Sequence, residues 1–389
     1  MPRFCSIFSQ LLQCFPRAEF QRAVTQTKAE RHARGFTCWG QFVAMMFYQL
    51  AGADSLREIV YGLRSCEGKL THLGITAPAR STLSYANAHR PWVLYQQVFY
   101  QMLDRCRTVV PGRKRFRFKN RLVSMDASVI ELCATVFAWA KFRRTKGAVK
   151  LHCQLDHAGY LPTVVVITDG KQHDLVVARQ QRFDAGTILV MDRGYIDYAW
   201  LASLDAAGVF FVTRLKDNTA YEVVERHPVP ARGNVLADEW IVLTGPQTRH
   251  KYESGRPLRR VEIWLPQEER TLVFITNHLD LGATTVARIY KDRWQIELFF
   301  KALKQNLRVK TFVGTSANAL HIQVWTALIA LLVLKYLQFK AHISWSFSNL
   351  SALLRMNLFV YRDLWAWLDT PYTAPPPPSL PEQGLLTFA

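Results

Sequence analysis

The stretch Tyr290-Lys-Asp-Arg-Trp-Gln-Ile-Glu-Leu-Phe-Phe-Lys-Ala-Leu-Lys304 places polar side chains at helical intervals. At about 100° per residue on an α-helix, four of them fall within an arc of roughly 60°: Tyr290, Arg293, Glu297 and Lys304. An apolar stripe lies beside that arc, made of Ile289, Ile296, Phe300 and Leu303. The pattern predicts one helix that packs by one edge and presents a carboxylate among cations. The alternative is a solvated face with an Arg293–Glu297 pair that contributes only a few tenths of a kcal/mol.

Two aspartates stand upstream in strand-like surroundings. The segment Leu122-Val-Ser-Met-Asp126-Ala-Ser-Val-Ile130 is typical of a strand that carries Asp126. The segment Thr187-Ile-Leu-Val-Met191 is typical of a buried strand that ends at Asp192. Either aspartate alone has an ordinary explanation, because an Asp at a strand end commonly forms a turn or caps a helix.

Together these residues resemble the Tyr-(2)-Arg-(3)-Glu-(6)-Lys signature of the insertion-sequence-four family of bacterial DDE transposases, with its two upstream aspartates. Every interval of the signature matches between Tyr290 and Lys304. The resemblance implies that three acids are both the catalytic residues and the metal ligands: Asp126, Asp192 and Glu297. Oxygen ligands without His or Cys suit Mg²⁺ or Mn²⁺, here a pair of ions.

The order of elements resembles the α+β, ribonuclease H-like fold with a mixed sheet. We expect strands and helices in the order β-β-β-α-β-α-β, over 122–130, 149–155, 161–168, a helix from about 174, 187–191, a helix at 198–206, and 209–213. In that fold the first and fourth strands are neighbours, which brings Asp126 and Asp192 together. Two ionised carboxylates so close repel each other and are costly to desolvate unless a cation lies between them.

Three domains are expected. Residues 1–110 read as a helical domain, which by resemblance binds DNA, and residues 120–310 as the catalytic core. Within the core, a β-rich insertion of about 218–277 accounts for the length between Asp192 and Glu297, and the family has such an insertion. Residues 311–389 read as helices, a possible dimerisation region around 347–368, and a proline-rich tail.

Two regions are candidate DNA contacts in addition to the core. A helix is predicted at 55–64, where it starts with a capping box, and another at 81–89. The two could form a helix-turn-helix that presents four residues to a DNA groove: Arg80, Ser84, Asn87 and His89. The connection 65–80 is longer than a standard turn, so an ordinary helical bundle is an equal alternative. The basic segment 112–121 either follows a phosphate backbone or forms a solvated strand edge.

Composition agrees with a DNA-handling protein. The chain has 49 Lys plus Arg against 30 Asp plus Glu, a net charge of +19, which favours polyanionic partners. Seven cysteines without a C-x-x-C pair indicate neither a zinc site nor a disulfide framework. This cysteine pattern suits a reducing cytoplasm, and we expect a bacterial cytoplasmic protein associated with the nucleoid. No secretory signal is evident. The apolar run 324–334 is too short to span a bilayer and predicts a buried core helix, so no membrane partner is expected.

The resemblance also implies a cut-and-paste reaction on double-stranded DNA. Hydrolysis frees a 3′-hydroxyl, which attacks the opposite strand to form a hairpin end, and after reopening joins target DNA, within a homodimer that pairs two element ends. The residues expected to hold phosphates are Tyr290, Arg293 and Lys304. Trp264 and Trp294 are candidates to stack on a flipped base, although a tryptophan is more often core.

Three further residues have open alternatives. Arg193 either contacts DNA phosphate or neutralises the acidic site, and His173 and Asp174 lie near the catalytic edge, where Asp174 reads as a helix N-cap. Two other functions compete with transposition. They are a catalytically silent DNA-binding protein derived from a transposase, and a ribonuclease H-like nuclease that does not join DNA.

Overall fold

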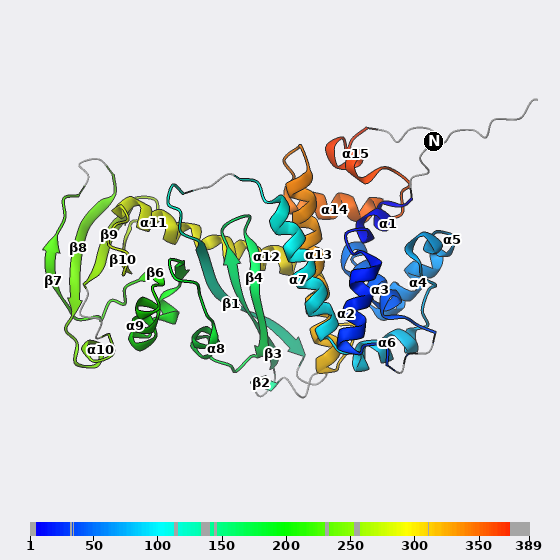
Figure 1. Ribbon diagram of the computed structural model, residues 1–389, viewed down its shortest axis with the longest axis horizontal. Coiled ribbons are helices and arrows are strands. Elements are labelled where there is room, and N and C mark those ends of the chain that lie inside the picture. The colour runs from blue at the N-terminus through cyan, green and yellow to red at the C-terminus, as the bar shows by residue number, and fades with distance from the viewer. Residues whose placement is uncertain are drawn as a thin grey trace, which may run out of the picture.

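The computed structural model describes residues 5–31, 33, 35–112, 116–133, 141–143, 146–229, 233–252, 257–309 and 311–373. Figure 1 shows an elongated molecule with insertion strands at one end, the strands that carry the aspartates in the middle, and the N-terminal helices at the other end. The predicted proline run at 375–378 lies outside the described residues.

The central strands have the predicted order. Strands β3 (Lys146–Asp156), β1 (Leu122–Cys133), β5 (Ile188–Met191) and β6 (Phe210–Arg214) are neighbours, and β4 (Leu161–Asp169) pairs with β3. Strands β1 and β5 run parallel, while β1 and β3 are antiparallel. A short strand that was not predicted, β2 (Lys141–Arg143), adds to β3. The expectation that the first and fourth strands of the core are neighbours is confirmed.

The insertion extends this same sheet. Its strands are β7 (Tyr221–Arg226), β8 (Val235–Leu243), β9 (Leu258–Leu265) and β10 (Arg270–Thr276), with the short helix α10 (Pro246–Arg249) between β8 and β9. Strand β10 pairs antiparallel with β6, where Phe274 opposes Arg214. The described strands therefore form one ten-stranded sheet.

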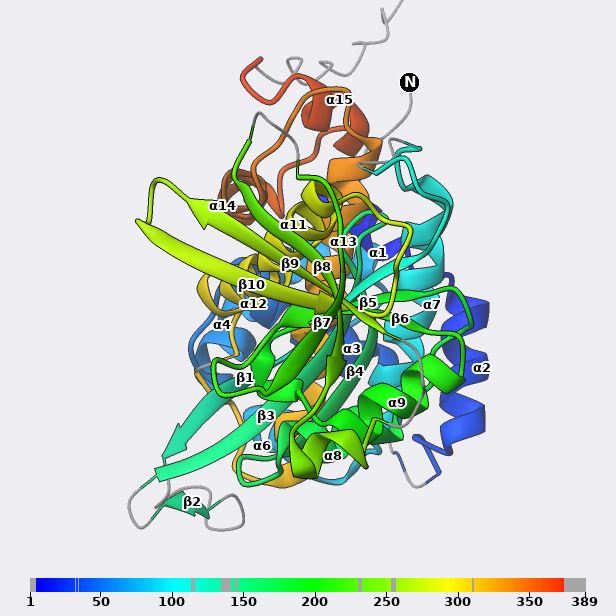
Figure 2. The same cartoon turned by 90° about the vertical axis from the view of Figure 1, so that its left-hand side faces the viewer.

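Helices cover both faces of the central strands. On one face, α8 (Asp174–Gln180) and α9 (Tyr198–Ala206) pack on Met125, Met191 and Phe211. On the other, α11 (Ala283–Asp292) packs on Ile188 and Val190. Figure 2 shows α11 and α9 on opposite sides of the sheet. This two-sided cover explains why Ile188 to Met191 reads as a continuous apolar run.

The signature segment is not one continuous helix, so that prediction is wrong. Helix α11 ends at Asp292 and α12 (Trp294–Asn306) begins at Trp294. At the junction the Arg293 N–H is shared between the carbonyls of Ile289 and Tyr290, both at 3.2 Å. Arg293 keeps right-handed helical dihedrals, φ −51° and ψ −33°, so the chain continues in a similar direction. The apolar stripe is buried as predicted, at Ile289, Ile296, Phe300 and Leu303.

The two ends of the chain build one helical body. From the N-terminal side come α1 (Ile7–Leu12), α2 (Arg17–Thr27), α3 (Cys38–Ala51), α4 (Leu56–Ser65), α5 (Glu67–Leu70), the 3₁₀ turn η1 (Thr71–Leu73), α6 (Arg80–His89) and α7 (Val93–Val109). From the C-terminal side come α13 (Ala317–Lys340), α14 (Phe347–Asn357) and α15 (Leu364–Asp369). Helix α13 packs against α3, α6 and α7 (Figure 1), and Ser6 forms a β-bridge with Tyr361.

Helix α13 is 24 residues long, more than twice the predicted apolar run. It is the one helix of the described chain long and apolar enough to cross a membrane. Its side chains are buried against neighbouring helices, as the core-helix prediction required; Trp325, Leu328 and Leu332 are at most 1% exposed. The six described cysteines are free, in agreement with the absence of a disulfide framework.

Several surface expectations for the helical body are corrected by burial. Asn87 is 1% exposed and accepts a hydrogen bond from Gln41 Nε2 at 2.8 Å, so it cannot contact a DNA groove. The predicted capping box is present, because Ser55 Oγ accepts from the Glu58 N–H at 3.2 Å. In the suggested dimerisation region, six apolar side chains belong to the core, at no more than 2% exposure: Leu350, Leu354, Leu358, Leu364, Trp367 and Leu368.

Candidate active site

Strand register places the two aspartates side by side. The last paired residues of β1 and β5 are Met125 and Met191, and each aspartate follows directly. Side chains alternate between faces along a strand, so both carboxylates project from the face that carries Ile188 and Val190. That is the face covered by α11, which continues toward α12 and Glu297.

Arg293 bridges the acids. Its Nη2 donates to Glu297 Oε1 at 2.8 Å, and its Nη1 lies 3.9 Å from Asp126 Oδ2. The Arg293 side chain is 12% exposed, against 24% for Asp126 and 33% for Glu297. Burial alone would lower the pKa of Arg293, but Tyr290, Glu297 and Asp126 raise it, so the guanidinium stays charged. The Arg293–Glu297 pair is therefore half-buried inside the acid cluster, and the alternative of a solvated surface pair is wrong.

Asp126 has a perturbed acidity. The pKa of its carboxyl is raised from 3.8 to about 6, mainly by burial and also by the charges of Glu297 and Asp192, while the Ala127 N–H and Arg293 act in the opposite direction. The Ala127 N–H donates to Asp126 Oδ1 at 2.8 Å. A carboxyl pushed toward neutrality by like charges gains from a bound cation. This feature distinguishes the cluster from an ordinary surface patch.

Tyr290 holds Asp192. The Tyr290 hydroxyl donates to Asp192 Oδ1 at 3.2 Å, and its ring packs on Phe274 with centroids 4.8 Å apart. Burial raises the pKa of Tyr290 to about 12, which keeps the phenol protonated as a donor. The structure thus places Tyr290 against a carboxylate rather than in the solvent, and its contact with DNA phosphate stays a prediction.

Lys304 points to the same strand as Asp126. Its Nζ donates to the Val129 carbonyl at 2.8 Å, three residues past Asp126 on β1. The hydrogen bond ties the second half of α12 to the sheet. Its predicted phosphate contact stays untested.

Both candidate tryptophans are exposed, so the core alternative is wrong for each. Trp294 is 55% exposed and directly follows Arg293 at the start of α12, while Trp264 is 38% exposed on β9. Val261 on β9 pairs with Phe274 on β10, which pairs with Arg214 on β6, and the β5–β6 register places Arg214 beside Asp192. Trp264 lies three residues past Val261 on β9. It alternates with Ile263, which packs on the α11 face, so its ring projects from the opposite face to the carboxylates. Trp294 is the better placed of the two.

Arg193 lies on the surface directly after Asp192. It forms an ion pair with the exposed Asp217, at 3.6 Å, and its side chain is 47% exposed. A surface pair of this kind contributes at most about 1 kcal/mol. Arg193 therefore remains available to a phosphate, which is the first of its two predicted roles.

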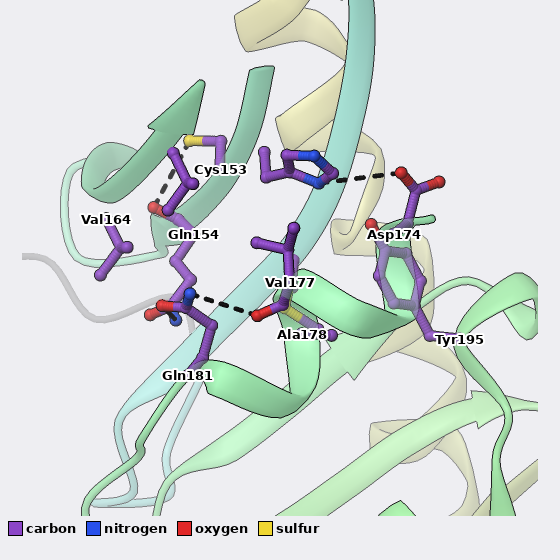
Figure 3. A pocket seen from close by; sticks show the side chains of 11 residues that line it. Cys153, Gln154, Val164, Asp174, Val177, Ala178, Gln181 and Tyr195 are labelled. Carbon is purple, nitrogen blue, oxygen red and sulfur yellow. Dashed lines mark hydrogen bonds and ion pairs between the residues drawn. The ribbon is translucent and has the colours of Figure 1, made fainter. Parts of the chain in front are cut away.

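The small cavity in Figure 3 lies on the other face of the sheet from the acids. Its volume is about 10 Å³, room for one water molecule, and it is lined by Met125, His152 and Tyr195 among others. His173, not Asp174, caps α8, because its Nδ1 accepts from the Leu175 N–H at 3.2 Å. Asp174 instead pairs with Lys150 Nζ at 2.9 Å. The expectation of an Asp174 cap is wrong, and neither residue faces the acid cluster.

The acids suit a hard divalent cation by chemistry and placement. Their ligand atoms are carboxylate oxygens alone, as Mg²⁺ and Mn²⁺ prefer. Across the described ranges, no three acidic, His or Cys side chains are already gathered as a metal site. Arg293 explains this, because it holds Glu297 and lies beside Asp126.

A buried group beside the cluster was missed by the sequence reasoning. Asp292, directly before Arg293, is 2% exposed and accepts from His157 and Tyr160. The position of Asp292 around the helix axis could have identified it. It falls at about −160° from Tyr290, at the border of the apolar stripe rather than on the polar face. A carboxylate in such a position needs buried partners.

Comparison with known proteins gives consistent matches. Residues 117–333 match the family described as the transposase DDE domain, and residues 5–76 match a domain of unknown function. A Sinorhizobium fredii protein named as a transposase, y4zB, is 29% identical over 296 residues, which cover 75% of this chain and 80% of that protein. Transposase InsG of insertion sequence IS4 from Escherichia coli is 22% identical over 202 residues, 49% of this chain and 44% of its own. The solved structure of a piggyBac transposase synaptic complex with hairpin DNA aligns with a TM-score of 0.45 and 10% identity, over 97% of this chain and 83% of that one.

Proposed function

The chain belongs to the DDE transposases of insertion sequences, and we propose that it binds the terminal inverted repeats of its own element and moves it by cut-and-paste cleavage and strand transfer. The observation that carries the proposal is the convergence of Asp126, Asp192 and Glu297 on one face of the sheet. The raised pKa of Asp126 supports their electrostatic coupling.

The three acids would hold the divalent cations, Mg²⁺ or Mn²⁺ and in our proposal two of them. Bound cations would supply Lewis-acid activation of water or a 3′-hydroxyl and stabilise the leaving oxygen. Tyr290 orients Asp192 through its hydroxyl, and Lys304 fixes α12 against β1. Once Glu297 turns to a cation, Arg293 loses its carboxylate partner and becomes a donor for a phosphate oxygen beside the scissile bond.

The same acids argue against one of the two competing functions. Burial of a carboxylate beside other acids costs folding free energy. A silent DNA-binding remnant has no function that would explain such a carboxylate, whereas a metal-dependent enzyme has one. A nuclease without joining activity would share the acids, and the experiment below separates it by its products. The proposed assembly is a homodimer that pairs two element ends on double-stranded DNA.

The test uses the purified full chain and a duplex that carries the imperfect inverted repeat flanking its gene. Wild-type protein with Mg²⁺ should cleave at the repeat boundary and join the freed 3′-end to a second duplex. Asp126→Ala should abolish cleavage and leave binding of the repeat largely intact, because the carboxylate is proposed as a metal ligand rather than a DNA contact. Substantial Mg²⁺-dependent cleavage by that variant would refute the triad. Cleavage by wild type without any joined product would favour the nuclease.

A further inference from the structure

Four side chains, three of them buried and the fourth, Tyr160, partly buried, connect the strand of Asp126 to the junction between α11 and α12. Ser124 Oγ lies 2.5 Å from His157 Nε2, and His157 Nδ1 lies 2.7 Å from Asp292 Oδ2. The Tyr160 hydroxyl donates to the same Asp292 oxygen at 3.1 Å. We name Ser124, His157, Tyr160 and Asp292 the junction network.

The hydrogen bonds of the junction network have a defined direction. A carboxylate only accepts, so His157 Nδ1 carries the proton and donates to Asp292, while Nε2 accepts from the Ser124 hydroxyl. The order Ser–His–Asp is also that of a hydrolase triad, but Ser124 is 0% exposed and no substrate can reach it. The side chains of His157 and Asp292 are 6% and 1% exposed. The junction network therefore has a structural role, and Ser124 does not act as a nucleophile.

The network joins three segments that carry or support the acids. Ser124 stands two residues before Asp126 on the same face of β1. Asp292 stands directly before Arg293, at the point where α11 ends. Between them lies the β3–β4 turn, whose His157 N–H donates to the Leu122 carbonyl at 3.0 Å.

The turn is also strained in a way that the network uses. Tyr160 has φ of 52°, a left-handed conformation that is unfavourable for an aromatic residue with a Cβ. That conformation persists where surrounding contacts enforce it, and its hydroxyl reaches Asp292. Backbone strain of this kind is commonest at functional sites, where a side chain has to be held in one orientation.

We propose that the junction network is a set of positioning residues that fixes the α11–α12 junction on β1 and so sets the placement of Glu297 relative to Asp126. The inference rests on the proposed function of these acids as metal ligands. The register of Glu297 depends on the junction because Arg293 shares its backbone N–H between two carbonyls and has no continuous helix to hold it. The buried carboxylate of Asp292 supplies the anchor that the helix lacks.

Asp292→Ala removes the anchor and leaves the acids and Arg293 in place. Under single-turnover conditions with the inverted-repeat duplex, cleavage should slow by about 10- to 100-fold, the usual cost of losing support behind a metal ligand. Affinity for the duplex should stay close to wild type. Binding of Mn²⁺ in the absence of DNA, followed by electron paramagnetic resonance, should weaken by about tenfold.

Asp292→Asn is the conservative variant that should rescue the rate. Its Oδ1 accepts from Tyr160 as before, and its amide donates to His157 Nδ1. His157 Nε2 then donates to Ser124, so the two His157 contacts are kept with their direction reversed. Most of the wild-type rate should return. If Asp292→Asn lost as much activity as Asp292→Ala, the charge and not the hydrogen-bonded anchor would matter, and the inference would be wrong.

Asp238→Ala is the matched control, because Asp238 is another buried carboxylate, 6% exposed, paired with Arg259 at 2.7 Å in the insertion. It should lower thermal stability without changing the Mn²⁺ affinity or the cleavage rate of folded protein. If Asp292→Ala does not fold, Ser124→Ala and Tyr160→Phe each delete one hydroxyl of the network and should give smaller losses of the same kind.

The two proposals fail differently. Wild-type protein that binds Mn²⁺ but never cleaves the duplex would overturn the proposed function. Wild-type protein that cleaves, beside network variants with unchanged cleavage rate and unchanged Mn²⁺ affinity, would overturn the positioning role alone.

Discussion

Arg293 donates to Glu297 at 2.8 Å from the junction of two helices, and in that position it also approaches Asp126 to 3.9 Å. The guanidinium thus balances two of the three acids from within the cluster. If Glu297 is a metal ligand, as we propose, a divalent cation and Arg293 compete for its carboxylate. Such competition would add to the phosphate contact expected of Arg293.

Arg293→Ala should therefore tighten Mn²⁺ binding to the free protein by several-fold. A partly buried pair contributes on the order of 1 kcal/mol, so the gain is bounded by roughly tenfold. Cleavage should nevertheless fall, and the salt dependence of DNA binding should drop by about one unit of slope for each lost phosphate contact. Lys304→Ala is the comparison variant, because it removes another cation of the same segment, whose Nζ donates to the Val129 carbonyl; its Mn²⁺ affinity should not rise. Equal Mn²⁺ affinity in wild type and Arg293→Ala would contradict the competition.

Tyr290→Phe should slow cleavage with little loss of stability. The change removes the hydroxyl that donates to Asp192 and keeps the ring that packs on Phe274. Loss of one orienting hydrogen bond behind a metal ligand costs about tenfold in rate. Thermal unfolding should shift by no more than a few degrees, since a hydrogen bond contributes about 1 kcal/mol. A variant that cleaves at the wild-type rate would show that Asp192 needs no such support.

Trp294→Ala should impair hairpin formation more than Trp264→Ala. Trp294 is the more exposed of the two and lies at the start of α12 beside Arg293, whereas Trp264 projects from the opposite face of the sheet to the acids. Stacking of a flipped base on an aromatic ring contributes about 1 to 3 kcal/mol. Fluorescence of a 2-aminopurine placed at the repeat end reports flipping directly. A larger loss in Trp264→Ala would reassign the stacking role.

His152 should make stability depend on pH below neutrality. Burial lowers the pKa of His152 from 6.5 to about 4, so the unfolded chain binds a proton between these values that the folded chain does not. Its contribution is fully present above about pH 6.5 and is lost as pH falls to about 4, by at most about 3 kcal/mol. Denaturation at pH 7.5 and 4.5 measures the difference.

His152→Gln is the control for that measurement, because glutamine keeps a polar contact for Thr168 and does not titrate. The carboxylates titrate in both proteins, so only the difference between them reports His152. An identical loss of stability on acidification in wild type and variant would remove His152 as the cause.

Local pattern was sufficient for the elements and for two of the acids. Alternation along 122–130 and the apolar run 187–191 predict two strands, and the resemblance to the ribonuclease H-like fold predicts that these strands are neighbours. The observed parallel register places Asp126 beside Asp192 on one face. Helical spacing likewise predicts the buried stripe of α12. These properties depend on neighbours within a few residues, which the sequence contains directly.

Tertiary structure alone decided the helix junction and the partners of the acids. Asp292 meets His157 across 135 residues, and Arg293, whose pair with Glu297 had a solvated surface contact as its alternative, lies inside the acid cluster. The exposure of Trp264 and Trp294 could not be predicted from the sequence either, because the residue type alone does not decide it. Trp325 in α13 is also a tryptophan and is buried. The sequence by itself determined which segments become strands and helices and which acids meet. Burial, which depends on what the rest of the chain places nearby, decided which charges are paired and which rings are left free.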